Sequence, residues 1–151
     1  MIITIGSKVK DGEGNTYTLT EELGHGGFGC VYKAECEADK SVYAVKTLLY
    51  SFGDEATAAS FKNEVRISSE VSGEHVIRYI YAHDGDEYPE LPPYIIMEYA
   101  EGGTLEDQIE ERKKTNSPYS KEELRNLFLQ LVAGMKSINK KLVHRDIKPE
   151  N

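Results

Sequence analysis

The sequence predicts an α+β fold in which an antiparallel sheet precedes a group of helices. Through about residue 100, segments rich in β-branched and aromatic residues alternate with short turn-rich connections, which is typical of strands joined by hairpins. Beyond that point, apolar residues recur at i, i+3 and i+4, which indicates amphipathic helices. These patterns predict an antiparallel sheet with one inserted helix, followed by amphipathic helices.

Two hairpins are expected to open the sheet. The first connects strands at residues 2–9 and 16–22 through residues 11–15, whose glycines and polar side chains favour a turn. The second connects residues 29–37 and 41–48 around residues 38–40. A helix that carries Glu64 is expected next, and two further strands then flank an acidic, proline-containing loop from His83 to Pro93.

Two helices are expected after the strands. Thr104 can cap a short helix that runs through Glu111. Ser120 and Glu123 match the S-x-x-E capping box that marks the start of a helix. The second helix carries an apolar stripe with helical spacing, which we expect to belong to a hydrophobic core. The stripe consists of Leu124, Leu127, Phe128, Leu131, Val132, Met135 and Ile138.

The composition limits the classes of protein to consider. A net charge of −8 argues against a nucleic-acid-binding surface, which is normally basic. No apolar run approaches the length of a membrane span, and the first residues lack the features of a signal peptide. Cys30 and Cys36 lie on one face of a single strand, where a disulfide has poor geometry. Reduced thiols, and therefore a cytoplasmic location, are expected.

The most specific motif lies at residues 144–151, which read His-Arg-Asp-Ile-Lys-Pro-Glu-Asn. These residues match the pattern H-R-D-x-x-x-x-N at each of its fixed positions. The pattern combines the carboxylate of Asp146, which can accept the proton of a substrate hydroxyl, with the amide oxygen of Asn151, which can hold a metal ion. The length of the match makes it far more specific than an H-R-D tripeptide.

Residues 24–29 have the spacing G-x-G-x-x-G, which taken alone is weak evidence for a nucleotide site. Glycines let a backbone approach phosphate oxygens closely, but dinucleotide-binding folds and flexible turns also use them. A dinucleotide fingerprint should open a helix, whereas Gly29 leads into the strand-like residues 30–34. The P-loop pattern is excluded because Cys30, and not lysine, follows Gly29.

Two further segments carry candidate functional residues. Residues 44–46 read Ala-Val-Lys, and Glu64 lies on the helix expected to follow. Taken singly, Lys46 would be a solvated strand residue and Glu64 a surface charge. Residues 94–105 describe a buried strand that ends in a Gly-Gly turn.

In this order and at comparable spacing, the four segments resemble the protein kinase superfamily, of the eukaryotic-like serine/threonine type, from about Tyr17 to Asn151. The resemblance implies transfer of a phosphoryl group from ATP, with Mg²⁺, to a hydroxyl group of a protein substrate. Lys148, two residues after the aspartate, is what the serine/threonine branch carries at that point.

The resemblance also assigns roles to individual residues. Asp146 becomes the catalytic base, Lys148 steadies the transferred group, and Asn151 becomes a metal ligand. Lys46, held by Glu64, becomes a phosphate contact. Within the nucleotide site, Met97 would be the gatekeeper, Glu98 and Ala100 would supply hinge backbone groups, and Thr104 would lie near the ribose. The expected nucleotide-contacting residues are Leu23, Gly24, Gly26, Gly27, Gly29, Val31, Ala44, Lys46, Met97, Glu98, Ala100 and Thr104.

By the same resemblance, residues 1–100 form the small lobe, a five-stranded antiparallel sheet with one inserted helix. Residues 101–151 form the first helices of the α-helical large lobe. The sequence contains no D-F-G or A-P-E motif, so we expect a fragment of a longer kinase that is inactive by itself. In a whole kinase, later helices cover the apolar stripe. Without them, we expect the chain either to self-associate through the stripe from Leu124 to Ile138 or to leave the segment after about Ser117 partly disordered.

Two other functions remain open. A non-catalytic nucleotide-binding or scaffolding module would have the same fold, although the presence of Lys46, Glu64, Asp146 and Asn151 counts against it. Phosphorylation of a small molecule is the other, and the Lys-Pro-Glu-Asn run at residues 148–151 argues against it by resemblance.

Cys30 carries a separate expectation. Val31 should face adenine, so strand alternation turns Cys30 towards the outer side of the glycine-rich turn. We therefore expect a solvent-reachable thiol of ordinary reactivity with no metal role.

Overall fold

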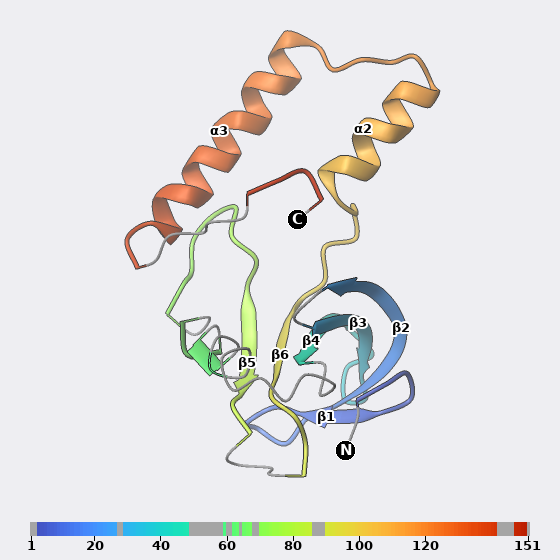
Figure 1. Cartoon of the computed structure of the whole chain (residues 1–151), viewed down its shortest axis with the longest axis vertical. Coiled ribbons are helices and arrows are strands. Elements are labelled where there is room, and N and C mark those ends of the chain that lie inside the picture. Colours follow the sequence, from blue (N-terminus) through green and yellow to red (C-terminus); the bar gives the residue numbers. More distant parts are fainter. Residues whose placement is uncertain are drawn as a thin grey trace. The chain divides into compact units, whose positions relative to one another are not determined.

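The structure is a computed structural model that describes residues 3–26, 29–48, 59, 62–63, 65–67, 70–85, 90–141 and 147–150. The chain forms two compact units, whose elements are labelled in Figure 1. Unit 1 comprises Met1–Glu70 and Ile77–Tyr99, and unit 2 comprises Val71–Val76 and Ala100–Asn151.

Unit 1 is built on an antiparallel sheet. Its strands are β1 (Lys8–Lys10), β2 (Thr16–Gly26), β3 (Gly29–Cys36), β4 (Val42–Leu48), β5 (Tyr79–His83) and β6 (Tyr94–Glu98). Their order in the six-stranded sheet is β1-β2-β3-β4-β6-β5. The predicted α+β class is confirmed. The sheet has six strands, whereas the resemblance to known kinases implied five, and the segments predicted from sequence patterns also number six. The short β1, which pairs with β2 at the edge of the sheet, lies at the end of the first predicted segment.

The beginning of the chain departs from the prediction of a strand at residues 2–9. Gly6 has a φ of +85°, which breaks an extended strand and which glycine adopts without steric cost. Its N–H donates to the Leu19 carbonyl at 2.8 Å, so the chain turns before β1 begins. β2, in contrast, runs past its predicted end at residue 22 to Gly26, because it keeps pairing with β3 through two register shifts.

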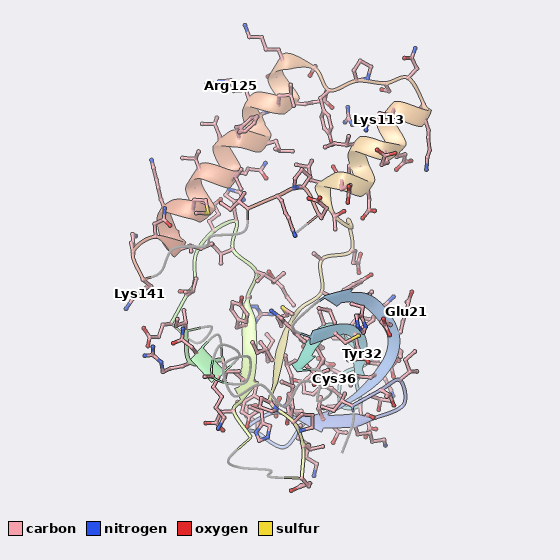
Figure 2. The ribbon with its side chains drawn as sticks, viewed as in Figure 1. Glu21, Tyr32, Cys36, Lys113, Arg125 and Lys141 are labelled. Atoms are coloured by element: carbon pink, nitrogen blue, oxygen red, sulfur yellow. The ribbon has the colours of Figure 1, made fainter. Side chains whose placement is uncertain are left out.

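One face of the sheet forms the main hydrophobic core of unit 1. Alternate residues of β3, including Cys30, Tyr32 and Cys36, are buried on this face, as the period of two in a strand requires. Figure 2 labels Tyr32 and Cys36 on this strand. Tyr94 and Ile96 of β6, on the other side of β4, belong to the same cluster. Both cysteines are free thiols.

The opposite face of the sheet carries a smaller cluster. Ile95 of β6 is fully buried there and packs against Val65, which lies in a helical stretch at residues 65–67. Residues 62–63 are also helical, so helical structure is present where the inserted helix was predicted. This cluster places the helical stretch against the face of the sheet opposite to the main core.

A buried carboxylate stabilises the connection between β1 and β2. Asp11 is 6% exposed and accepts hydrogen bonds from the backbone N–H groups of Glu13 and Asn15. It also accepts from the Asn15 amide and from the Tyr17 hydroxyl, each at 2.8 Å. Burial alone would raise the pKa of Asp11, but these hydrogen bonds outweigh it and hold the pKa below its ordinary value.

Unit 2 contains two helices, α2 (Leu105–Lys114) and α3 (Lys121–Ile138). Both begin with a capping box, in which the hydroxyl of the cap and the carboxylate three residues later bond each other's backbone N–H. The pairs are Thr104 with Asp107 and Ser120 with Glu123. Arg112 of α2 bonds Glu123 at 2.7 Å, and together with the cap this lowers the pKa of Glu123 to about 2.

The described residues leave much of the apolar stripe of α3 uncovered, as expected. Leu124, Phe128 and Val132 remain 41%, 58% and 48% exposed. The buried residue of α3 is Gly134, where an added Cβ would lie 2.6 Å from the His75 carbonyl oxygen. No helix in the described part of the chain is both long enough and apolar enough to cross a membrane.

Candidate functional site

Strand register places three of the predicted site residues side by side. Gly24 of β2 pairs with Val31 of β3, Val31 pairs with Lys46 of β4, and Lys46 pairs with Ile95 of β6. Directly opposed residues of antiparallel strands project from the same face. Because Ile95 contacts Val65, this face carries the smaller cluster and not the main core. Gly24, Val31 and Lys46 therefore form one row across the sheet, called here the 24–31–46 row.

A second row lies beside the first on the same face. Ala44 is two residues before Lys46 on β4, so alternation gives both side chains the same direction. Ala44 is buried and pairs with Met97 of β6, which is half-buried and pairs in turn with Tyr79 of β5. The sequence-predicted residues Ala44 and Met97 thus adjoin Lys46 on this face, which also carries Lys33, the β3 residue that pairs with Ala44.

Glu98, the residue after Met97, is hydrogen-bonded to Arg78, which directly precedes β5. The backbone N–H of Glu98 donates to the Arg78 carbonyl at 2.9 Å, and the Glu98 carboxylate accepts from the Arg78 N–H at 2.9 Å. These bonds fix the end of β6. Ala100, two residues later, is exposed and lies outside any helix or strand.

The glycine-rich segment lies at the end of the β2–β3 hairpin. Gly26 pairs with Gly29, which is buried, and Leu23 is 39% exposed. Among the described residues, a Cβ added to Gly24 would meet no heavy atom within 4 Å, and one added to Gly26 would meet the Gly29 carbonyl oxygen at 3.8 Å. Packing against the described residues therefore does not require glycine at 24 or 26. The open space suits the close approach of another group to the backbone.

Four predicted site residues, Gly27, Glu64, Asp146 and Asn151, lie outside the described residues. At least one neighbour of each in the sequence is described. Val65, next to Glu64, packs on the face that carries the 24–31–46 row.

In unit 2, residues 147–150 are bonded to the start of α2. The Pro149 carbonyl accepts from the Glu106 N–H at 3.0 Å, which satisfies one of the amides left unpaired in the first turn of a helix. Lys148 is exposed and lines a groove of about 570 Å³ with residues of α2 and α3. Thr104 donates its hydroxyl to Asp107 at 2.7 Å. Sequence reasoning missed this partner of Thr104, although the pattern T-x-x-D signals it.

The expectation of a solvent-reachable Cys30 is wrong. Its side chain is 1% exposed, and burial raises the pKa of the thiol. Alternation does turn Cys30 away from Val31, but that side of the sheet is the main core. The thiol lies 3.6 Å from Nδ1 of His25, a residue to which the sequence motifs assign no role.

Residues 17–151 match the family model of the protein kinase domain. The chain belongs to the protein kinase family. The antiparallel sheet and the helices that follow it are those of a kinase small lobe and the start of a large lobe.

Curated relatives cover most of this kinase chain. The interferon-induced, double-stranded RNA-activated protein kinase of Rattus norvegicus is 31% identical over 147 residues, which cover 87% of the chain and 27% of the relative. Wee1-like protein kinase 2 of Homo sapiens is 33% identical over 133 residues, which cover 87% of the chain and 23% of the relative. A Clostridium perfringens protein named "Probable serine/threonine-protein kinase" is 34% identical over 140 residues, with 91% and 19% covered. The chain thus spans about a quarter of the length of these relatives.

Proposed function

We propose that this chain is part of an ATP-dependent serine/threonine protein kinase, with residues 1–100 as the small lobe and residues 101–151 as the start of the large lobe. The observation that carries the proposal is the 24–31–46 row. It combines an open glycine backbone, a half-buried valine and a half-buried lysine on one face of the sheet. An apolar surface beside a cation suits a nucleotide, which has a flat base and anionic phosphates.

The residues beside this row would form the rest of the nucleotide site. We assign Ala44 and Met97 to the adenine-facing surface, with the backbone of Glu98 and Ala100 as the hinge. The N–H of Glu98 is already donated to Arg78. Any hinge bond from Glu98 must therefore come from its carbonyl, and the hinge N–H must come from Ala100. A ribose contact by Thr104 would compete with its bond to Asp107.

The transfer chemistry is assigned to the catalytic loop. ATP with Mg²⁺ supplies the phosphoryl group and neutralises its charge when bound. Asp146 would accept the proton of the substrate hydroxyl, and Lys148 would hold the transferred group. Asn151 offers an amide oxygen, a donor that suits Mg²⁺. Glu64 would orient Lys46 towards the phosphates.

Specificity for serine or threonine in a protein substrate is inferred from Lys148. The Clostridium perfringens relative, which is named as a probable serine/threonine-protein kinase, supports this inference. Transfer also needs the aspartate of a D-F-G motif, and the 151 residues contain no such motif. We therefore propose that these residues by themselves bind ATP without transferring phosphate. The free thiols of Cys30 and Cys36 favour a cytoplasmic location.

Lys46→Ala tests the nucleotide site, and Lys10→Ala, an exposed lysine of β1, serves as its matched control. Titration of the chain with a fluorescent ATP analogue and magnesium gives the Kd. Loss of a phosphate contact should weaken binding at least tenfold, about 1.4 kcal/mol, while Lys10→Ala binds like the wild type. Unchanged binding by Lys46→Ala would refute the assignment. In a longer chain that includes D-F-G, Lys46→Ala should also abolish phosphoryl transfer.

We further propose that the isolated chain self-associates through α3. Phe128 and Leu129 are 58% and 53% exposed, and contiguous exposed apolar surface promotes association. Light scattering should show a dimer or larger species that Phe128→Lys shifts to the monomer. Asn126→Lys adds the same charge elsewhere on α3 and should leave the mass unchanged. A monomeric wild-type chain would contradict this proposal.

A further inference from the structure

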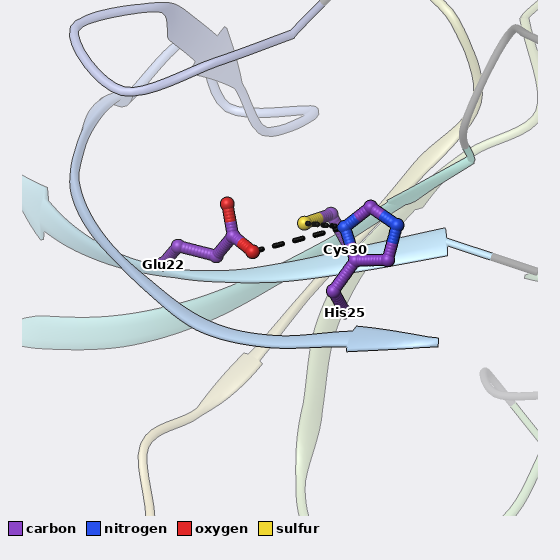
Figure 3. Close-up of side chains that lie close together, drawn as sticks. All are labelled: Glu22, His25 and Cys30. Atoms are coloured by element: carbon purple, nitrogen blue, oxygen red, sulfur yellow. Dashed lines mark hydrogen bonds and ion pairs between the residues drawn. The ribbon is translucent and has the colours of Figure 1, made fainter. Parts of the chain in front are cut away.

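Three potential metal ligands gather at the glycine-rich end of the β2–β3 hairpin (Figure 3). The ligand atoms of Glu22, His25 and Cys30 all lie within 4.8 Å of one another. Nδ1 of His25 is 3.6 Å from Sγ of Cys30 and 3.7 Å from Oε1 of Glu22. None of the three is among the nucleotide-contacting residues proposed above.

Strand pairing explains why these side chains meet. His25 pairs directly with Cys30, and Glu22 pairs with Tyr32. In a regular strand, residues 22 and 25 would face opposite sides because their spacing is odd. A register shift between Glu22 and Gly24 inserts one residue as a β-bulge, so both side chains project to the Cys30 side. The cluster is thus built on paired strands.

The distances fit a shared ion better than a direct bond between Glu22 and His25. An N–H···O hydrogen bond spans about 2.7–3.2 Å, shorter than the 3.7 Å observed. Around a tetrahedral zinc ion with ordinary bond lengths, nitrogen and oxygen ligands are roughly 3.4 Å apart, and nitrogen and sulfur ligands roughly 3.6 Å. The two observed distances agree with this geometry to within a few tenths of an ångström. The exposed Glu22 side chain can rotate to bring its oxygen nearer to Sγ.

The donor set suits a transition metal such as zinc. A thiolate and an imidazole favour zinc, whereas magnesium and calcium prefer oxygen ligands alone. The side chains of His25 and Glu22 are 61% and 46% exposed, so an ion can bind these two ligands from solvent, whereas Cys30 is 1% exposed and completes the site from the buried side. Three protein ligands leave one position of the tetrahedron for water.

We infer that Glu22, His25 and Cys30 form a zinc site that fastens β2 to β3 at the glycine-rich end of the hairpin. The inference does not depend on the nucleotide site, because metal binding is measured without nucleotide. It also revises the expectation that Cys30 has no metal role.

Titration of the 151-residue chain with Co²⁺ tests the site, because cobalt replaces zinc and a cobalt–thiolate bond gives a charge-transfer absorption band. One cobalt ion per chain should bind, and an equimolar amount of zinc should displace it. His25→Ala and Glu22→Gln should each weaken binding at least about tenfold, and Cys30→Ser should remove the band. The matched controls are Cys36→Ser, at the second buried thiol of β3, and Glu21→Gln, at the neighbouring carboxylate. Both should bind cobalt like the wild type.

Several results would overturn the inference: no saturable thiolate band in the wild-type chain, a band that survives Cys30→Ser, or binding that His25→Ala leaves unchanged. Circular dichroism of each variant checks its folding. Should Cys30→Ser unfold, His25→Ala decides the question, because that side chain is exposed and its loss leaves the core intact.

Discussion

Replacing Asp11 with alanine removes a buried carboxylate but leaves all of its hydrogen-bond donors in place. The Tyr17 hydroxyl is affected most, because Tyr17 is only 3% exposed and loses its partner at 2.8 Å. The backbone N–H groups of Glu13 and Asn15 lie nearer the surface, where water can replace the carboxylate. The substitution therefore leaves one buried donor, the Tyr17 hydroxyl, without its acceptor and weakens the connection between β1 and β2.

The magnitude follows from these contacts. A buried donor without a partner costs about 1–3 kcal/mol, and hydrogen bonds to a charged group contribute about 1.5–3 kcal/mol each. The contributions within one cluster do not add, and part of the loss is recovered by water. We expect Asp11→Ala to lower the free energy of unfolding by about 3 kcal/mol at neutral pH. Tyr17→Phe, which removes one donor and no charge, should lower it by about 1 kcal/mol.

The pH dependence gives a second check. Hydrogen bonds hold the pKa of folded Asp11 below that of the unfolded chain. The stabilisation is therefore complete above the unfolded pKa, about 3.9, and is lost as the pH falls through the folded pKa. The stability difference between the wild type and Asp11→Asn, which has no titrating carboxyl, should shrink in acid.

Urea unfolding followed by near-ultraviolet circular dichroism provides the measurement, because most tyrosines lie in unit 1. A loss below about 0.5 kcal/mol for Asp11→Ala at neutral pH would refute the reasoning, because changes of that size are ordinary for surface positions. The reasoning would also be refuted if the difference in the free energy of unfolding between the wild type and Asp11→Asn stayed the same in acid.

Three further predictions concern the helices and the thiols. Gly134→Ala should gain about 1 kcal/mol of helix propensity but clash with the His75 carbonyl, for a net loss of about 1 kcal/mol in thermal or urea unfolding. Ser120→Ala should destabilise α3 by about 0.5–2 kcal/mol, measured as lost helical circular dichroism on heating. Cys30 and Cys36 should react slowly with a maleimide in the folded chain and rapidly in urea, because both are buried.

Each of these has a control within the chain. Ala133→Gly measures the contribution of helix propensity alone at the neighbouring position. If Gly134→Ala stabilised the protein, the backbone near His75 would have to move aside at little cost. Ser117→Ala removes a hydroxyl that caps no helix. If it destabilised α3 as much as Ser120→Ala does, the loss could not be attributed to the capping box. Fast labelling of either thiol without urea would contradict its burial.

Local patterns predicted the elements whose signals lie within a few residues. β3 and β4 begin or end within one residue of the predicted positions, and the Ser120–Glu123 capping box begins α3 as expected. The N-terminal strand was mispredicted because the left-handed Gly6 is fixed by a bond to Leu19, which is distant in sequence. Such a bond leaves no periodic trace in the sequence.

For the site, motif spacing identified Gly24, Val31 and Lys46, and strand register then placed them in one row. The direction of Cys30 was harder to predict. Alternation indicates which residues share a face, but burial of that face depends on contacts with residues such as Val9, far along the chain. The bulge that brings Glu22 beside His25 likewise depends on pairing with β3 and has no sequence signal of its own.

The division of the chain has a consequence for anyone who wishes to produce the sheet alone. The backbone passes from one unit to the other at 70/71, at 76/77 and again at 99/100. Stopping translation after Tyr99 would keep the whole sheet but would also keep Val71–Val76, deprived of the helix residue Gly134 beside His75. That short stretch would be a target for proteases. Replacing it with a short flexible linker is therefore a better design than truncation alone.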